Sequence, residues 1–448
     1  MANTSGGNST KQLKQVLGFK ELLSTAIGQI IGAGIMTLLG AGIALTGRSI
    51  PLAFLISFFL VIGTCIPLAI VTGTVRVRGG QYTMVGMLAG KEMAGFFVIM
   101  HILINVSLAM YGISFAQYFM AFFGIGNTKV IAVIVLTVFY LINLVGVDVM
   151  AKFQNVIVIL MCIALGLFAA FGVGQVTPNY LTEDFMPNGV FGLFQAAGLL
   201  YFAMGGCYVI TNLSAEAKRP TRDIPLAMIV STLIVALLYA VVSIVAAGVL
   251  PVDVVAGQTL DAVARTILPA PVYAFFMVAG AMFALISTLN AQYAWAPKPV
   301  MQACDDGWFS QKLAYLHPKF NTPVVLITIL YVFGVVCVIS GLDVSILSNL
   351  ATIAGCLADL LISMFLWRLP KVVVPAWEKS KFKLSPVALR ACCVICSIAC
   401  VITLYLNATQ LTLPLLVANI IVIIVALIWA YFRGKSGKVH MEMSYEEV

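Results

Sequence analysis

Two glycine-rich interruptions of apolar sequence carry the residues best suited to bind a small zwitterion. The first is Gly32-Ala33-Gly34, and the second is Gly205-Gly206. Each glycine lowers helix propensity by about 1 kcal/mol relative to alanine, so both segments are expected to leave the helical conformation. A broken helix exposes N–H groups, which attract a carboxylate. It also exposes carbonyls, here those of Phe202 and Gly205, which attract an ammonium group. The sequence therefore predicts one substrate site at the two breaks, with close helix packing at small residues as the alternative.

Polar side chains inside apolar sequence form a second set of candidates. His101 and Asn105 are four residues apart, so they share one face of a helix. Asp359 is the clearest carboxylate well inside an apolar stretch. Because ionisable groups in a bilayer usually serve a function, we predict that His101 and Asp359 carry a proton or pair with a cation, and that Asn105 contacts substrate. The alternative for each is a structural interhelical hydrogen bond, of about 1 kcal/mol.

These residues must be positioned by membrane-spanning helices. The chain has 448 residues, of which 62% are hydrophobic and 9% are charged, whereas a soluble domain carries roughly 25% charged residues. We therefore predict an all-α integral membrane protein with twelve transmembrane helices, each near the roughly 20 apolar residues that crossing requires. The predicted spans are residues 20–46, 50–73, 94–123, 128–147, 153–175, 190–213, 224–250, 269–297, 323–341, 345–367, 387–405 and 411–432.

The basic residues are divided unequally between the two predicted sides. With the N-terminus and the even-numbered loops on one side, all but three of the 25 Lys and Arg residues lie there. Loops rich in Lys and Arg stay in the cytoplasm, so both termini are predicted to be cytoplasmic. The same imbalance accounts for the net charge of +8 without a nucleic-acid partner. We expect an integral protein of a bacterial plasma membrane, in contact with the lipid bilayer.

Other classes of function lack sequence features that they need. The ten cysteines have no metal-ligand partners at suitable spacing, and the three histidines share no motif. We therefore expect no enzyme, no metal centre and no cofactor. No Gly-x-x-x-x-Gly-Lys-Ser/Thr sequence occurs, which leaves ATP-driven pumping without support. A channel is the alternative class, although a channel would favour a filter element repeated around a pore.

Four motifs in order along the chain resemble those of the amino acid–polyamine–organocation (APC) family. They are Ile27–Met36, Arg78–Tyr82, Glu216–Pro225 and Asp305–Phe309. The resemblance implies an amino acid transporter with a LeuT-type fold, which has a five-plus-five inverted repeat and two extra C-terminal helices. It divides the chain into a cytoplasmic N-terminal segment, two repeats, a helix pair and a cytoplasmic tail, which are residues 1–19, 20–175, 190–367, 387–432 and 433–448.

The resemblance also implies roles for individual residues. Phe202 falls at the position of the family's gating aromatic, and His101 and Asp359 remain candidates for gating or coupling. The Ala-x-x-Ser-Thr pattern of the eighth span resembles the sodium site of sodium-coupled transporters with this fold, and its members are Ala284, Ser287 and Thr288. The predicted substrate-binding residues are Ile31, Gly32, Ala33, Gly34, Asn105, Phe202, Gly205 and Tyr208.

Two departures from the family pattern bear on substrate and coupling. Tyr208 stands where many members carry an acid in the sixth span, and Met161 stands where many carry a lysine that replaces sodium. Because no carboxylate is expected to face the substrate, we predict neutral amino acids, carried by exchange or proton symport. One alternative is an antiporter of a basic amino acid or polyamine, which Ala303–Gly307 resembles. The other is a sodium-coupled symporter, and the oligomeric state is left open.

Overall fold

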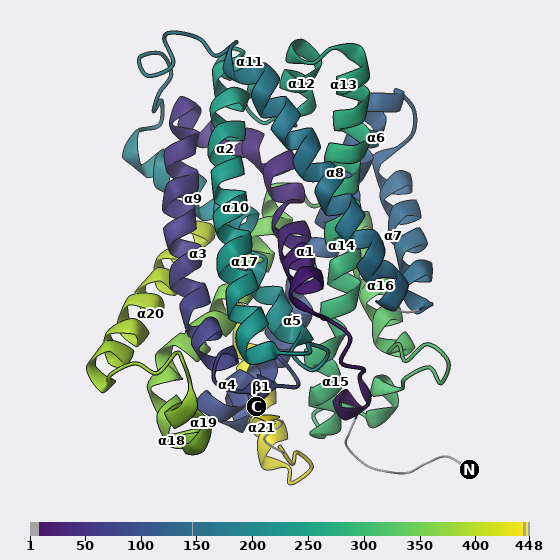
Figure 1. The fold of residues 1–448 in the computed structure, drawn as a ribbon, viewed down its shortest axis with the longest axis vertical. Helices are drawn as coiled ribbons and strands as arrows, with labels where there is room; N and C mark the ends of the chain where they lie inside the picture. The colour runs from purple at the N-terminus through teal and green to yellow at the C-terminus, as the bar shows by residue number, and fades with distance from the viewer. Residues whose placement is uncertain (1–8, 146, 442–444, 447–448) are drawn as a thin grey trace.

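The chain folds into a bundle of helices, most of which run along the long axis of the molecule (Figure 1). The computed structural model describes residues 9–145, 147–441 and 445–446, and gives side chains for all of these except 147–153. Apart from one pair of two-residue strands, every regular element among the described residues is helical. The predicted all-α class is confirmed.

The helices of eight residues or more include both membrane-length segments and shorter pieces. They are α1 (Phe19–Ile30), α2 (Leu39–Thr46), α3 (Ile50–Thr72), α4 (Gln81–Ala89), α5 (Lys91–Ile104), α6 (Ser107–Phe123), α7 (Thr128–Leu144), α8 (Val147–Val173), α9 (Gly189–Met204), α10 (Pro220–Gly248), α14 (Phe283–Trp295), α15 (Pro297–Asp305), α16 (Val324–Ser340), α17 (Val344–Phe365), α20 (Pro386–Ala408) and α21 (Leu413–Lys435).

Shorter elements connect these helices. The short α-helices are α11 (Val252–Val255), α12 (Asp261–Ile267), α13 (Ala270–Phe275), α18 (Leu369–Val372) and α19 (Val374–Lys379). Turns of 3₁₀ helix cover Thr10–Gln12, Gly47–Ser49, Cys207–Leu213, Gln311–Ala314 and Leu366–Arg368, and π-helical turns cover Gly34–Leu38 and Phe276–Met282. The strands β1 (Arg76–Val77) and β2 (Tyr445–Glu446) pair in antiparallel register.

The apolar helices account for most of the bundle. Nine stretches of the described residues are long and apolar enough to cross a membrane, and the first of them, Phe19–Thr72, contains α1, α2 and α3. The helices α7 and α16 are also apolar, with 17 residues each. Large apolar side chains such as Leu237 and Phe432 lie exposed on the outer surface, as expected for contact with lipid.

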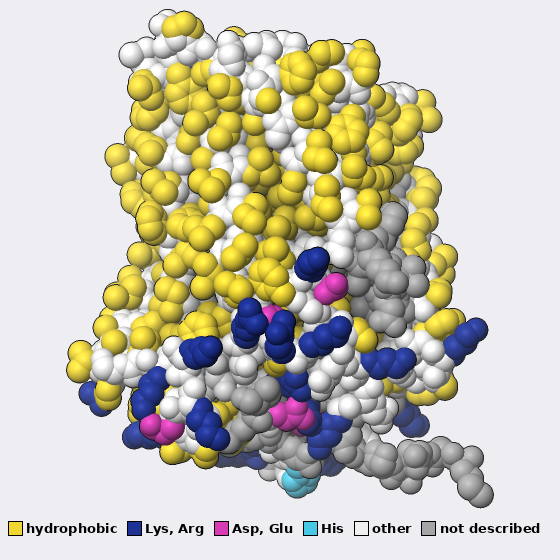
Figure 2. Space-filling view, in the orientation of Figure 1, with side chains coloured by type: hydrophobic (Ala, Val, Ile, Leu, Met, Phe, Trp, Pro, Cys, Tyr) yellow, Lys and Arg dark blue, Asp and Glu magenta, His cyan; other side chains and the backbone are white. Residues whose placement is uncertain are grey.

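Charged side chains gather at one end of the molecule, which we call the charged end. On the face drawn in Figure 2, Lys and Arg side chains lie in the lower part, while the upper part shows many hydrophobic side chains and no charged one. The 3₁₀ turn Thr10–Gln12 and the strand β2 lie at the same end (Figure 1). Both ends of the described chain therefore lie on one side of the apolar bundle.

Two interrupted helices cross at the centre of the bundle. The helix α1 ends at Ile30, and the chain resumes a helical course at Gly34. The helix α9 ends at Met204, and a 3₁₀ turn begins at Cys207. Close packing holds the breaks together, because a Cβ atom on Gly34 would overlap the backbone of Ala203. Both interruptions were predicted from their glycines.

Hydrogen bonds and ion pairs join distant segments at the charged end. Leu17 pairs with the segment before α10, where its N–H donates to the Glu216 carbonyl at 3.0 Å. The Lys298 ammonium lies 2.9 Å from a Glu216 carboxylate oxygen, and both side chains are buried. In β2, Glu446 pairs with Arg76 at 3.1 Å and also with Arg78. These contacts connect the start of α1, the α3–α4 loop and α15 below the central crossing.

Candidate functional site

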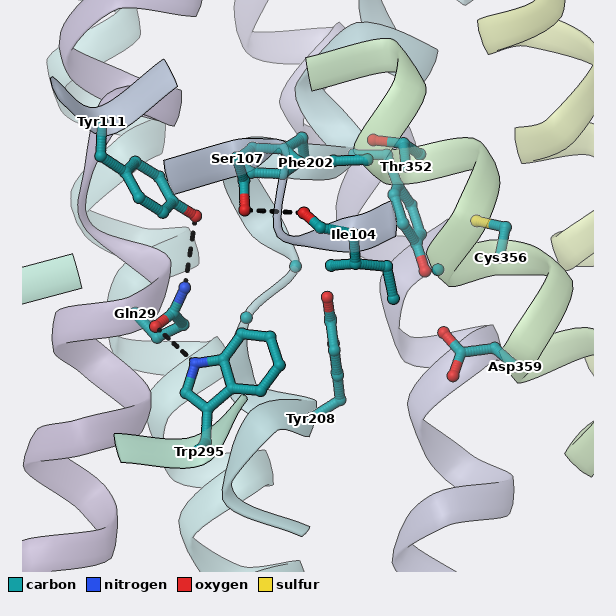
Figure 3. A pocket seen from close by; sticks show the side chains of 15 residues that line it. Gln29, Ile104, Ser107, Tyr111, Phe202, Tyr208, Trp295, Thr352, Cys356 and Asp359 are labelled. Carbon is teal, nitrogen blue, oxygen red and sulfur yellow. Dashed lines mark hydrogen bonds between the residues drawn. The ribbon is translucent and has the colours of Figure 1, made fainter. Parts of the chain in front are cut away.

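A buried cavity lies beside the crossing of the two broken helices. Its volume is about 30 Å³, room for about two water molecules. Figure 3 shows Gln29 and Trp295 on one side, Asp359 on the other and Tyr208 between them. The lining residues come from α1, the end of α5, α6, α9, its break and the 3₁₀ turn that follows, α14 and α17. They are Gln29, Ile104, Ser107, Tyr111, Tyr201, Phe202, Gly205, Gly206, Tyr208, Trp295, Ala351, Thr352, Gly355, Cys356 and Asp359.

The α9 break forms part of the cavity wall. Phe202, Gly205 and Tyr208, which were predicted to bind substrate, all line the cavity. The Gly205 N–H donates to the Tyr201 carbonyl at 2.8 Å, which closes the last turn of α9. Among the described residues, no donor after the break reaches the carbonyls of 202–204. These acceptors form the negative end of the α9 dipole, which attracts a cationic group.

The α1 break lies behind the cavity wall in this arrangement. Ile31, Gly32, Ala33 and Gly34 are buried but are not among the lining residues. A Cβ atom on Gly32 would overlap the Thr288 hydroxyl. Within the described chain, the backbone N–H groups of Gly32 and Ala33 donate no hydrogen bond. The break therefore keeps two buried N–H donors without partners, although it is closely packed by its neighbours.

Gln29 is the α1 side chain that reaches the cavity. Its amide N–H donates to the Tyr111 hydroxyl at 3.3 Å, and its amide oxygen accepts from the Trp295 indole at 3.1 Å (Figure 3). All three residues line the cavity, and none of them was predicted. A polar glutamine three residues before Gly32 was the signal for Gln29, whereas nothing in the sequence marked Tyr111 or Trp295.

Ser287 and Thr288 meet the end of α1. The Thr288 hydroxyl lies 2.9 Å from the Gly28 carbonyl, 2.9 Å from the Ala284 carbonyl and 3.4 Å from the Ile31 carbonyl. The Ser287 hydroxyl lies 3.4 Å from the same Gly28 carbonyl. Five oxygen atoms thus converge, which is the type of ligand set that unwound carbonyls offer to sodium. The predicted Ala284–Ser287–Thr288 group comes together, but apart from the cavity.

A glutamine from α8 reaches this oxygen cluster. The Gln154 amide N–H donates to the Ser287 hydroxyl at 2.6 Å, and the Gln154 side chain is 3% exposed. The group that α8 presents to the oxygen cluster is therefore a neutral amide donor. The resemblance to the APC family places Met161 at the position of the lysine that replaces sodium. Met161 lies seven residues further along α8 and is buried among apolar side chains, so Gln154 is the polar group of α8 that the resemblance did not identify.

Asn105 and His101 lie in the α5 region but do not line the cavity. The Asn105 amide donates to the His101 carbonyl at 2.8 Å and accepts from the Gln292 amide at 2.9 Å. Gln292 also donates to Ser107, which does line the cavity. The His101 imidazole donates to the Ala296 carbonyl at 2.9 Å and packs on the cavity residue Trp295. The His101 side chain is thus one contact removed from the cavity, and the Asn105 side chain is two contacts removed.

Asp359 on α17 lines the cavity opposite Gln29. Its side chain is 3% exposed, and one carboxylate oxygen accepts from the Gln81 amide at 2.9 Å. The prediction of neutral substrates rested on the absence of a carboxylate facing the site. That premise does not hold, because Asp359 and Tyr208 share one cavity. The sequence could not reveal this, since α17 is remote from α9 along the chain.

Comparisons with known proteins agree with this architecture. The sequence matches the amino acid permease family over residues 17–438. It is 28% identical over 393 residues to the branched-chain amino acid permease BcaP of Bacillus subtilis, covering 81% of this chain and 82% of that protein.

Other relatives are named for different substrates. The serine/threonine exchanger SteT of Bacillus subtilis is 26% identical, with 70% of this chain and 74% of that protein covered. The mitochondrial cationic amino acid transporter 3 of Arabidopsis thaliana is also 26% identical, with 70% and 56% covered. The match covers nearly the whole chain, and the apolar helical bundle agrees with it. This chain therefore belongs to the amino acid permease family of integral membrane transporters.

Proposed function

We propose that this chain is a secondary active transporter that carries amino acids by alternating access. The observation that carries the proposal is the meeting of two interrupted helices beside one buried cavity. The N–H groups of Gly32 and Ala33 and the carbonyls of 202–204 have no partners among the described residues. The carboxylate and ammonium groups of an amino acid would satisfy these two sets together.

The proposed cycle brings both breaks into contact with the substrate. The cavity touches Gly205 and Gly206 but not Gly32 or Ala33. A movement that separates α1 from α9 would extend the cavity to those N–H groups. Phe202, which lines the cavity in the last turn of α9, would act as the gate.

The proposed architecture has twelve membrane crossings in a LeuT-type arrangement. Phe19–Thr72 crosses twice, the other eight apolar stretches cross once each, and α7 and α16 supply the last two crossings. The helices α1 and α9 each begin one half of an inverted repeat, and α20 and α21 follow the second half. Because Lys and Arg gather at the charged end, we place that end and both termini in the cytoplasm of a bacterial cell.

The proposed coupling does not use sodium. The Gln154 amide already donates into the Ser287 cluster, so a neutral donor offsets the partial negative charge of the α1 carbonyls. Exchange or proton symport is therefore preferred. Sodium symport remains the second candidate, because the five converging oxygens suit that ion.

The test is radiolabelled uptake by the purified protein in liposomes. The panel holds neutral and basic L-amino acids, their D-enantiomers and diamines, with protein-free liposomes as the control. Vesicles are loaded with or without unlabelled amino acid, and sodium and proton gradients are imposed separately. We expect saturable, stereoselective uptake that needs either internal amino acid or a proton gradient.

Each other outcome would overturn a different part of the proposal. Uptake into empty vesicles that requires a sodium gradient would replace the coupling with sodium symport. Flux that does not saturate and does not distinguish enantiomers would indicate a channel. An absence of uptake for every amino acid in the panel would contradict the assigned substrate class.

A further inference from the structure

Asp359 is a buried carboxylate that has no cationic neighbour in the part of the chain that the structure describes. None of the ion pairs found among the described residues involves it, and its carboxylate accepts a hydrogen bond from the neutral amide of Gln81. The ionisable groups that face it from α3, α9, the 3₁₀ turn after the break, α17 and α20 are thiols and phenols. They are Cys65, Tyr201, Cys207, Tyr208, Cys356 and Cys400.

This environment requires a positive partner from outside the protein. A thiol or a phenol is neutral or becomes negative on ionising, so none of these neighbours can neutralise a carboxylate. An unpaired charge in a buried site is strongly unfavourable, and a single amide hydrogen bond does not remove the cost. The carboxylate therefore needs a proton when the site is empty and a cation when it is ionised.

The position of Asp359 in the cavity indicates whether its cationic partner is a small ion or the end of a longer substrate. Figure 3 shows the carboxylate pointing toward Tyr208 from the side opposite Gln29. The cavity wall near Asp359 includes the apolar or small side chains of Ile104 and Cys356 (Figure 3), and Gly355 also lines the cavity. A molecule bound by its zwitterion at the breaks would lay an aliphatic chain along this wall before it reached Asp359.

We propose that Asp359 is a specificity-determining residue that binds the ammonium group at the end of the substrate's side chain. The favoured substrate is then an amino acid with an unbranched aliphatic side chain and a terminal ammonium group. An ammonium group suits the site because Gln81 already donates to one carboxylate oxygen, whereas a guanidinium group binds best to both oxygens at once. This inference rests on the proposed transport function and adds the substrate class.

Gln81 is a positioning residue for the carboxylate. Its own backbone N–H donates to the Asn212 side chain at 3.0 Å, which ties the start of α4 to the turn after the α9 break. The carboxylate is thereby held by an element from the charged end. Movement of α4 relative to α17 would change how firmly Asp359 is held.

The experiment compares two substrates that differ by one group. Lysine and norleucine have the same unbranched four-carbon side chain, and only lysine carries an ammonium group at its end. Apparent KM values for both are measured in proteoliposomes for the wild type and for Asp359→Asn, Asp359→Glu and Asp343→Asn. Asp343 is exposed at the start of the same helix, so its variant is the matched control.

The expected result is a change in the ratio of the two KM values. The wild type should favour lysine by at least about tenfold, and Asp359→Asn should remove that preference, because truncation of a buried charge pair is costly. Asp359→Glu should keep part of the preference, and Asp343→Asn should keep all of it. Lysine should also raise the Tm of the detergent-solubilised wild type more than norleucine does.

Results that contradict the role of Asp359 can be distinguished from results that contradict the transport function. Wild-type uptake that favours norleucine overturns the inference even if no Asp359 variant folds. Loss of proton-driven uptake in Asp359→Asn with an unchanged KM ratio would make the carboxylate a proton carrier only. Uptake of neither amino acid, nor of any other in the panel, would instead overturn the transport function.

Discussion

The breaks in α1 and α9 have similar glycine-rich sequences but different surroundings. At the α1 break, the carbonyls of Gly28 and Ile31 lie within hydrogen-bonding distance of Thr288, and the carbonyl of Ile30 accepts from Tyr239. At the α9 break, the carbonyls of 202–204 have no such partners among the described residues, and Gly205 lines the cavity. The carbonyls at the α1 break thus have side-chain partners, whereas the carbonyls at the α9 break are free to bind a ligand.

This difference indicates that the two breaks have different roles. Satisfying carbonyl groups with hydroxyls stabilises an unwound segment, because an unpaired buried polar group costs about 1–3 kcal/mol. Leaving them unpaired reserves them for a group that arrives from outside. Substitutions at the α1 break should therefore act mainly on stability and on the approach of the helices, and those at the α9 break mainly on substrate affinity.

Gly34→Leu is expected to have the largest effect. Even a Cβ atom at this position would overlap the backbone of Ala203, so a leucine would push α1 away from α9. Uptake should be abolished, and this is measured in proteoliposomes after membrane insertion has been checked. Gly166→Leu is the matched control, because a Cβ atom there meets nothing within 4 Å. Uptake by Gly34→Leu at the control's level would contradict the α1 part of the site.

Gly206→Ala is expected to have the next largest effect. Gly206 has a φ of +125°, and an added Cβ atom would lie 3.0 Å from the Gln29 carbonyl oxygen. Such a backbone conformation costs a non-glycine residue about 1–3 kcal/mol.

The neighbouring Gly205 is the control within the same break. It has a φ of −69°, and an added Cβ atom would lie 3.1 Å from the nearest atom, the Tyr201 carbonyl oxygen. Gly206→Ala should lower both the Tm and the rate of uptake, whereas Gly205→Ala should mainly raise KM. Equal losses of Tm in the two variants would remove the distinction between strain and ligand contact.

Thr288→Val should lower stability without changing substrate preference. The substitution keeps the shape of the side chain but removes the hydroxyl that reaches the Gly28 carbonyl, for a loss of about 1–3 kcal/mol. The measurement is the Tm of the purified protein, with Thr288→Ser as the variant that keeps the hydroxyl. A shift in the ranking of substrates at constant Tm would place Thr288 in the substrate site instead.

Asn105→Ala should have the smallest effect of the four. Asn105 acts on the cavity through Gln292 and Ser107, so its loss removes one supporting hydrogen bond, of about 1 kcal/mol. We expect the KM ranking of amino acids to change more than the maximal rate, as measured by competition in proteoliposomes. An unchanged ranking would leave Asn105 with the structural role that its bond to the His101 carbonyl indicates.

The sequence by itself determined the class of the protein and the location of both breaks. Apolar stretches and glycine clusters act within one helix, where neighbours along the chain decide whether the backbone can stay helical. The unequal distribution of Lys and Arg likewise needs no knowledge of packing. Phe202, Gly205, Tyr208 and Asp359 were therefore identified before their surroundings were known.

Only the tertiary structure decided which of these residues meet. It placed Asp359 in one cavity with Tyr208, and it brought Gln154, not Met161, to the Ser287 hydroxyl. It also put the Asn105 side chain two contacts away from the cavity, behind Gln292 and Ser107. The physical reason is that the rotation of each helix about its axis, and the helix that it faces, depend on packing between segments remote in the chain, which a one-dimensional pattern does not encode.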